Sequence, residues 1–225
     1  MNIKEYFIAI IYGLSFKFFK LAIYSRVPFP RYIYMHSPQQ LQALCNLLLS
    51  SNCEGSILEV GVVEGWTACY LLEAMKEAGM NRPYIGIDTF DGFLKGDYEW
   101  EYNNRNKQGE NFENYFKINN KEWVEYSIKR FRYHNVKLYK ADASTFDYKS
   151  IAPIAFCLLD IDLYRPIRET LPKIFKHVST KGTIVVDDCI PNQIWDGAYQ
   201  AYVEFCNEVG LERKIISDKY GIIQK

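Results

Sequence analysis

The sequence predicts an α/β domain with a mostly parallel sheet, helices on both faces of that sheet and an antiparallel edge. Three observations support this prediction. Short apolar runs of strand length alternate with amphipathic segments of helix length, several of the apolar runs end in glycine or aspartate, and two short strands lie close together near the end of the chain. Strands separated by helices need crossover connections, and these place helices on both faces of a parallel sheet.

The first half of the domain is expected to run helix, strand, helix, strand. Ser37-Pro38 is typical of an N-cap followed by proline in the first helical turn, and leucines at helical spacing extend this helix to about Ser50. An apolar run over 56–61 predicts a strand that enters a glycine turn. Residues 67–77 predict a helix, and residues 84–88 predict a strand that ends in an acid.

The second half is expected to supply a helix over 122–131 and three strands, over 136–139, 154–160 and 183–187. A helix between the last two strands has a single apolar face, made of Ile167, Leu171, Ile174, Phe175 and Val178. A final helix over 198–209 ends at Gly210. Strands over 212–216 and 220–223 are close enough to pair antiparallel, which brings the predicted sheet to seven strands.

Two segments stand outside this alternation. Residues 93–120 are polar, aromatic and rich in Asn and Gly, without clean periodicity, and an insertion of this length is typical of a lid or binding loop. We expect it to cover the bound substrate and to be mobile when the substrate is absent. We also expect residues 1–50 to form a helical extension and residues 51–225 to form the domain.

Residues 1–24 are rich in Phe, Tyr and Ile, but the uncharged run from Tyr6 to Phe16 has 11 residues, which is too few to span a bilayer. Two interpretations stay open. The segment forms an amphipathic helix that packs on the domain or on a second subunit of a homodimer, or it lies in a membrane interface as a peripheral helix.

The composition excludes some classes of function. Lys plus Arg and Asp plus Glu each number 27, so the chain lacks the basic excess of a nucleic-acid-binding protein. The six cysteines form no CxxC pair, and the three histidines have no ligand spacing, which disfavours a zinc site. Reduced cysteines that act as small apolar residues are typical of a cytoplasmic protein, with membrane association only if the N-terminal helix is interfacial.

A glycine turn follows the first predicted strand, in the segment Glu59-Val-Gly61-Val-Val-Glu-Gly65. Gly61 can adopt the dihedral angles of a tight strand-to-helix turn, and Gly65 allows the backbone to approach a ligand closely. Asp88 ends the next strand, where an acid can accept from ribose hydroxyls, and Asp142 follows the third strand, where an acid can accept from an adenine amino group. Both aspartates could instead be turn or cap residues. The third glycine of the dinucleotide fingerprint is absent, which disfavours a nicotinamide dehydrogenase.

Four aspartates end two further strands. Asp160 ends an apolar strand and Asp162 follows it, while Asp187-Asp188 ends the next strand, 27 residues after Asp160. Because adjacent parallel strands lie about 4.8 Å apart, these carboxylates should converge. Close like charges are unfavourable unless a cation or a proton intervenes, and ligands that are all oxygen suit Mg²⁺, Ca²⁺ or Mn²⁺. The alternative is that one or two of these acids cap the following helices.

Taken together, these segments resemble the macrocin O-methyltransferase (TylF-type) family of class I S-adenosylmethionine-dependent methyltransferases. The resemblance covers about residues 35–215. The segments that carry it are Glu59–Gly65, Asp88-Thr-Phe-Asp-Gly92, Lys140-Ala-Asp142-Ala, Leu159-Asp160-Ile-Asp162-Leu-Tyr164 and Lys181-Gly-Thr-Ile-Val-Val-Asp187-Asp188. The glycine loop departs from the family pattern, because Val-Val-Glu-Gly stands where the family has Val-Trp-Arg-Gly.

The resemblance implies a Rossmann-like class I methyltransferase fold and methyl transfer from S-adenosylmethionine to a sugar hydroxyl, assisted by Mg²⁺ or another hard divalent cation. By matching position, the cofactor loop would be Glu59, Gly61 and Gly65. Asp88 would hold the ribose and Asp142 the adenine side, and the metal ligands would be Asp160, Asp187 and Asp188.

The same resemblance leaves several alternatives open. A carboxylate must take the proton of the hydroxyl, and Asp160 and Asp162 are both candidates. The acceptor is expected to be a sugar or glycoside. Two other functions are a methyltransferase of a phenolic, catechol-like acceptor and a non-catalytic binding protein that kept the fold.

Overall fold

The structure, a computed structural model, describes residue 11 and residues 36–117 and 119–225. The helix expected over residues 1–24 therefore lies outside the described residues, apart from Ile11. Residues from His36 to Lys225 form one compact unit. The helix that was assigned to the extension of residues 1–50 belongs to this unit, because three of its leucines are buried in the core.

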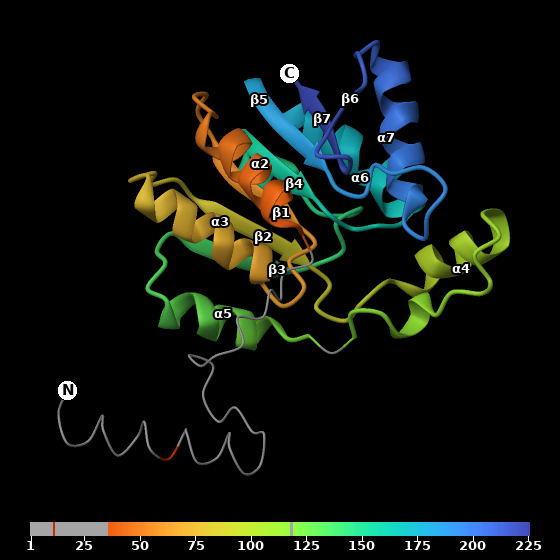
Figure 1. Ribbon diagram of the computed structural model, residues 1–225, viewed down its shortest axis with the longest axis horizontal. Helices are drawn as coiled ribbons and strands as arrows, with labels where there is room; N and C mark the ends of the chain where they lie inside the picture. The colour runs from red at the N-terminus through yellow and green to blue at the C-terminus, as the bar shows by residue number, and fades with distance from the viewer. Residues whose placement is uncertain (1–10, 12–35, 118) are drawn as a thin grey trace. The chain divides into compact units, whose positions relative to one another are not determined.

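The described part of the chain contains a seven-stranded sheet with the strand order β3-β2-β1-β4-β5-β7-β6. Strands β1 to β5 are parallel, and β7 runs antiparallel to both β5 and β6 (Figure 1). The strands are β1 (Ser56–Val60), β2 (Tyr84–Asp88), β3 (Val136–Lys140), β4 (Ile154–Leu159), β5 (Val178–Val186), β6 (Lys214–Ile216) and β7 (Tyr220–Gln224). The predicted parallel sheet with an antiparallel edge is confirmed.

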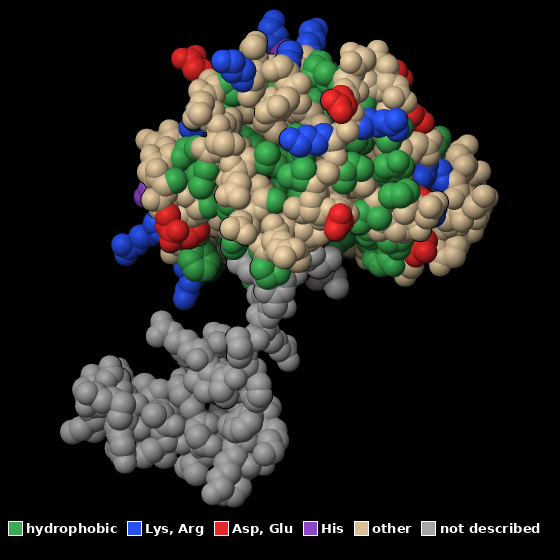
Figure 2. Space-filling view, turned by 45° about the horizontal axis from the view of Figure 1, so that its top comes forward, with side chains coloured by type: hydrophobic (Ala, Val, Ile, Leu, Met, Phe, Trp, Pro, Cys, Tyr) green, Lys and Arg blue, Asp and Glu red, His purple; other side chains and the backbone are tan. Residues whose placement is uncertain are grey.

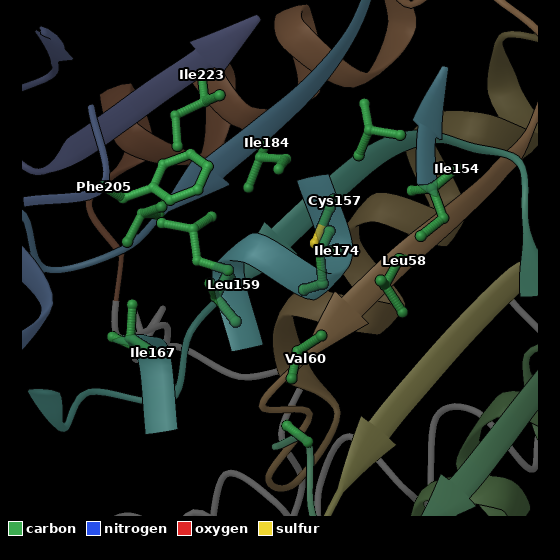
Figure 3. Close-up of a cluster of buried hydrophobic side chains, with 14 of the residues drawn as sticks. Leu58, Val60, Ile154, Cys157, Leu159, Ile167, Ile174, Ile184, Phe205 and Ile223 are labelled. Carbon is green, nitrogen blue, oxygen red and sulfur yellow. The ribbon is translucent and has the colours of Figure 1, made fainter. Parts of the chain in front are cut away.

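Helices cover both faces of the sheet. One face packs against α2 (Pro38–Leu49), α3 (Trp66–Glu77) and α5 (Lys121–Arg130). The other face packs against α6 (Tyr164–His177) and α7 (Asp196–Val209), and Figure 3 shows side chains of this second core layer. The central strand β4 is buried along its whole length, so it reads in the sequence as a continuous apolar run rather than as an alternating one.

Local signals account for most of the helix boundaries. The hydroxyl of Ser37 accepts from the backbone N–H of Gln40, and the side chain of Gln40 accepts from the N–H of Ser37, which forms a capping box. Gly210 ends α7 in the left-handed conformation. The largest difference from the predicted boundaries is at β5, which begins at Val178 instead of residue 183. Val178 was expected on the face of the preceding helix, but it pairs with Ile154 of the neighbouring strand.

The insertion of residues 93–120 contains regular structure that the sequence did not predict. It forms the helix α4 (Lys95–Asn104) and a short 3-10 helix, η1 (Phe112–Asn114). Figure 1 shows α4 standing apart from the two helical layers. The only buried residue of α4 is Glu101, so the helix lacks the apolar stripe by which helices are recognised in a sequence.

An aromatic cluster joins this insertion to the segment before α7. The ring centroid of Phe93 lies 5.4 Å from that of Phe116 and 5.9 Å from that of Trp195. Phe112, which is fully buried, lies 5.5 Å from Trp195. Such contacts add to the stabilisation from apolar burial, so the insertion has a small core of its own.

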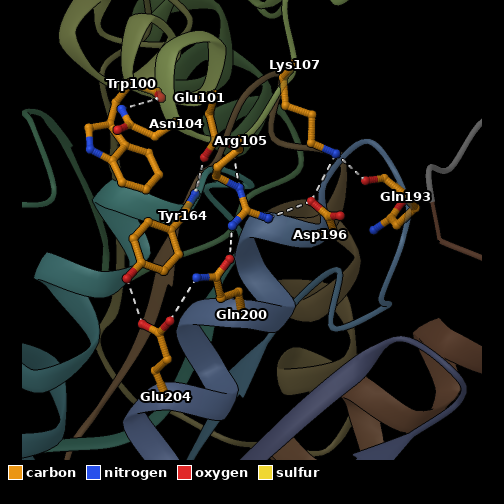
Figure 4. A network of polar contacts seen from close by, with 10 residues as sticks. All are labelled: Trp100, Glu101, Asn104, Arg105, Lys107, Tyr164, Gln193, Asp196, Gln200 and Glu204. Carbon is orange, nitrogen blue, oxygen red and sulfur yellow. Dashed lines mark hydrogen bonds and ion pairs between the residues drawn. The ribbon is translucent and has the colours of Figure 1, made fainter.

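Ion pairs and hydrogen bonds join α4 to α6 and α7 (Figure 4). The carboxylate of Glu101 accepts from the backbone N–H of Tyr164 at 2.7 Å and lies 2.8 Å from Nε of Arg105. Nη2 of Arg105 and Nζ of Lys107 lie 2.7 and 3.0 Å from Oδ1 of Asp196. These charged groups are largely buried, so losing one partner would leave another charge uncompensated. The contacts determine how α4 lies against α6 and α7.

The sheet contains one buried carboxylate. Glu59 in β1 is 1% exposed and accepts a 2.6 Å hydrogen bond from the hydroxyl of Tyr84, while its other oxygen is buried without a hydrogen-bond partner. Burial raises the pKa of Glu59 to about 8, with a contribution from Asp88, although the hydrogen bond from Tyr84 opposes the shift. The protonated acid is therefore the stable form of Glu59 in the folded protein at neutral pH.

This shift makes stability depend on pH. A Glu whose pKa rises from 4.5 to about 8 on folding contributes stability that is fully present below pH 4.5 and is lost as the pH rises towards 8. We expect Glu59→Gln, which stays neutral and keeps the Tyr84 contact, to be more stable than the wild type above pH 5. The difference should grow up to about pH 8. Urea unfolding between pH 5 and pH 8 measures it.

Glu77→Gln is the matched control, because Glu77 is an exposed carboxylate at the end of α3. Its unfolding free energy should stay parallel to that of the wild type over the same pH range. A Glu59→Gln variant that also stays parallel would show that Glu59 is ionised in the folded protein.

Candidate active site

A cleft lies at the carboxyl ends of the parallel strands. It has a volume of about 560 Å³, including space open to solvent. The residues that line it follow β1, β2, β3 and β4 or belong to the insertion and α6. They are Val60, Gly61, Val63, Ile87, Asp88, Thr89, Gly92, Phe93, Leu94, Asp97, Phe116, Ala141, Asp142, Ala143, Asp160, Ile161, Asp162 and Pro166. Ligands of open α/β sheets bind at this edge, which makes the cleft the candidate active site.

The turn after β1 forms one wall of the cleft. Gly61 has a φ of +95°, and a Cβ atom there would lie 1.7 Å from the backbone oxygen of Asp160, so no other residue fits. The close approach of these two backbones brings the turn and the end of β4 together. Gly65 does not line the cleft and has a φ of +79° at the start of α3, where a Cβ atom would lie 2.7 Å from Val124.

Asp88, at the end of β2, joins the turn to the next loop. Its carboxylate accepts from the backbone N–H of Val63 at 2.8 Å and from that of Phe90 at 2.6 Å. Val63 has a φ of +48°, which is unfavourable for a β-branched residue, and the bond to Asp88 stabilises that conformation. A carboxylate offers about four acceptor sites, so Asp88 can also accept from a ligand in the cleft.

Asp142 lines the cleft and also forms a turn. One oxygen accepts from the N–H of Ser144 at 2.8 Å, and the other accepts from its hydroxyl at 2.9 Å. Glu59 is buried in β1, two residues before Gly61, and does not line the cleft. Glu64 accepts from the indole N–H of Trp66 at 2.7 Å on the exposed surface.

Four aspartates converge beside the cleft, as their positions at the strand ends predicted. Asp160 and Asp162 follow β4, and Asp187 and Asp188 follow β5. Carboxylate oxygens of Asp160, Asp162 and Asp188 all lie within 4.8 Å of one another. Asp162 and Asp188 have φ values of +59° and +51°, a conformation that Asp tolerates better than most residues and that turns both side chains towards the cluster.

The environment of the cluster disfavours ionised carboxylates. Burial raises the pKa of Asp160 well above its usual range, and the neighbouring Asp187 and Asp162 raise it further. Burial also raises the pKa of Asp162, Asp187 and Asp188. Oδ1 of Asp187 is buried without a hydrogen-bond partner. Like charges this close need protons or cations between them, so the cluster is a candidate cation site.

Two residues of the cluster were missed by the sequence analysis. Lys219, in the turn between β6 and β7, places Nζ 2.9 Å from Asp187 and 3.3 Å from Asp188. Nitrogen atoms of His36 lie 4.0 Å from oxygens of Asp160 and Asp187, and its Nδ1 lies 3.0 Å from the hydroxyl of Tyr220. No local motif marks either residue, because each comes from an element far from these aspartates in sequence.

His36 is a neutral base in this environment. Burial, and then the charge of Lys219, lowers the pKa of His36 to about 4. The structure therefore offers one nitrogen ligand beside the carboxylates, since His36, Asp160 and Asp187 also place ligand atoms within 4.8 Å of one another. The spacing of the three histidines in the sequence could not reveal this nitrogen ligand, because only His36 lies at the site.

The surface agrees with the balanced composition. On the face drawn in Figure 2, acidic and basic side chains are interspersed around hydrophobic ones. Among the described residues, no helix is both long and apolar enough to cross a membrane.

Comparisons with known proteins agree with this geometry. Residues 34–223 match the model of the macrocin-O-methyltransferase (TylF) family. A search of curated proteins finds no match. The calicheamicin methyltransferase CalS11 shares 16% identity over 100% of this chain and 93% of its own, with a TM-score of 0.71.

Two further solved structures are similar. The O-methyltransferase NovP shares 18% identity over 83% of this chain and 78% of its own, with a TM-score of 0.65. The O-methyltransferase TomG from Streptomyces achromogenes, in complex with SAM, shares 16% identity over 83% of this chain and 78% of its own, with a TM-score of 0.51. These likenesses confirm the predicted Rossmann-like class I methyltransferase fold. The family match, which spans most of the chain, confirms the resemblance seen in the motifs: the protein belongs to the macrocin-O-methyltransferase (TylF) family and is an S-adenosylmethionine-dependent O-methyltransferase.

Proposed function

We propose that this enzyme methylates a hydroxyl group of a sugar or of a sugar-containing small molecule, with the assistance of Mg²⁺ or another hard divalent cation. The observation that carries the proposal is the convergence of Asp160, Asp162, Asp187 and Asp188 beside the cleft at the strand ends. A sugar hydroxyl is a poor nucleophile, and a site of this kind can bind it, orient it and accept its proton.

S-adenosylmethionine would supply an electrophilic methyl group, and the residues of the cleft would bind and orient it. Asp88 would accept from the ribose hydroxyls, and Asp142 would face the adenine. Gly61 lines the cleft and allows the end of β1 to approach the end of β4, because any side chain there would collide with the backbone of Asp160.

The residues of the cluster fit a hard divalent cation. Its carboxylates supply oxygen ligands, and the buried Oδ1 of Asp187 lacks a partner that a cation would provide. Asp160, Asp187 and Asp188 would hold the ion, which would lower the pKa of a bound hydroxyl. Asp160 and Asp162 both line the cleft. With Asp160 assigned as a ligand, Asp162 is the candidate base.

The proposal that the acceptor is a sugar is supported by the family match and by one similar structure. CalS11 is described as a TDP-rhamnose 3'-O-methyltransferase. We further propose that the insertion of residues 93–120 acts as a lid, since Phe93, Leu94, Asp97 and Phe116 line the same cleft as Asp88 and Asp142. Activity on nucleotide sugars, with none on a simple catechol, tests the class of acceptor.

The cofactor site is tested by Asp88→Ala. Removing a charged acceptor from the ribose should weaken binding of S-adenosylhomocysteine by about 10- to 100-fold, which corresponds to about 1.5–3 kcal/mol. Isothermal titration calorimetry measures the affinity, and thermal unfolding checks that the turn survives. Asp91→Ala, an exposed acid on the same loop, is the control and should bind as the wild type does. Equal affinity of all three proteins would remove Asp88 from the cofactor site.

The metal site is tested by replacing its acids. Asp187→Asn or Asp160→Asn keeps the size of the side chain and removes its charge, so the fold should persist while methyl transfer falls by about 100-fold or more. Electron paramagnetic resonance of Mn²⁺ should show weaker binding in both variants. Asp162→Asn is the matched comparison and should lose turnover but still bind the ion. Full methyl transfer with excess chelator would contradict the metal proposal.

Lys219 should oppose the binding of that ion, since its ammonium group contacts two of the proposed ligands. Two cations that share the same carboxylates repel each other at short range, so Lys219→Met should tighten Mn²⁺ binding by about tenfold or more. Lys214→Met, which removes an exposed lysine from the same hairpin, should change it little. Weaker binding in Lys219→Met would show instead that the ammonium group organises the ligands.

A further inference from the structure

Asp97, in the first turn of α4, has a carboxylate to which no residue of the described part of the chain donates a hydrogen bond. It lines the cleft, and its side chain is 15% exposed. Its nearest cationic partner is Arg165, whose Nε lies 3.9 Å from Oδ1 of Asp97, which is beyond hydrogen-bond distance. Burial raises the pKa of Asp97 to about 6, and Arg165 offsets this only in part. A carboxylate in such a position is poorly compensated within the protein, so a ligand that donates a hydrogen bond would stabilise it.

The position of Asp97 follows from the way in which α4 is held. Glu101 lies four residues later, on the same face of the helix, and accepts from the first turn of α6 at Tyr164. Arg105 continues this contact to Asp196 of α7, as Figure 4 shows. The face of α4 that carries Asp97 and Glu101 is therefore turned towards α6 and the cleft.

Asp97 shares its part of the cleft with Asp142. Both residues line the cleft. Arg165 of α6, whose Nε lies 3.9 Å from Asp97, also interacts electrostatically with Asp142. Since the adenine is proposed to face Asp142, Asp97 is placed to meet the same part of the cofactor.

The surroundings of Asp97 suit a flat base with a donor at its edge. Phe93, Leu94 and Phe116 of the insertion provide apolar surface in the same cleft. Asp142, the other acid at this end, already accepts from the N–H and the hydroxyl of Ser144, whereas the oxygens of Asp97 accept from no group of the described chain. Asp97 is thus the more available acceptor.

We propose that Asp97 accepts a hydrogen bond from the exocyclic amino group of the adenine ring and so selects adenosyl ligands over ligands with a 6-oxo purine. This inference rests on the proposed placement of the cofactor in the cleft. It makes α4 a part of cofactor recognition, although the sequence analysis assigned the insertion to the acceptor.

The test compares two ligands that differ in one group, S-adenosylhomocysteine and S-inosylhomocysteine. By calorimetry, the wild type should prefer the adenosyl ligand by about tenfold or more, because the 6-oxo group would face the carboxylate. Asp97→Asn should bind S-adenosylhomocysteine at least about tenfold more weakly. It should also lose or reverse the preference, since its amide can donate to the 6-oxo group.

Glu99→Gln is the matched control, because it removes a half-exposed charge from the same helix, and it should keep the wild-type affinities. Asp97→Ala, checked by near-ultraviolet circular dichroism, provides a second variant if the amide disturbs α4. If both Asp97 variants keep the wild-type preference for the adenosyl ligand, the inference is overturned and the cofactor site stays as proposed. The same holds if the variants change only the KM of the acceptor. A wild-type protein that binds neither ligand would overturn the placement of the cofactor itself.

Discussion

Repulsion among four carboxylates at the ends of β4 and β5 is the constraint on which the site depends. Parallel pairing of these two strands brings the acids together, and the burial of Asp187 and Asp188 limits screening by water. The fold compensates with a lysine from the β6–β7 turn and with protons, which the raised pKa values favour. This arrangement is poised to accept a cation, because compensation within the chain is incomplete at Oδ1 of Asp187.

The cleft beside this cluster is built from backbone as much as from side chains. Gly61 allows β1 and β4 to approach each other at their ends, and Asp88 stabilises the strained conformation of Val63 in the turn between β1 and α3. Glu59, two residues before Gly61, is a buried acid whose raised pKa favours the protonated form and which accepts a hydrogen bond from Tyr84. The motif that marks a cofactor loop in the sequence therefore combines Gly61, which lines the cleft, with Glu59 and Gly65, which are buried and do not line it.

The insertion shows how a polar segment becomes ordered by tertiary contacts. Its helix α4 has no apolar stripe, and charged groups join it to α6 and α7 through Glu101, Arg105 and Asp196. The aromatic cluster around Phe112 and Trp195 completes the attachment. A segment that composition alone describes as a loop is thus a wall of the cleft, and Asp97 is placed by contacts made one and two turns away.

Periodicity and strand-end residues were sufficient to predict the seven strands, the helices on both faces and the convergence of Asp160 with Asp187. These features follow from local patterns and from the common direction of parallel strands, so the sequence alone determined them. Only the tertiary structure shows that His36 and Lys219 join the cluster and that α4 forms. It also shows that Glu59, which was expected in the cofactor loop, is buried in the core. The physical reason is that these outcomes depend on burial and charge compensation between distant segments, which no local pattern of residues records.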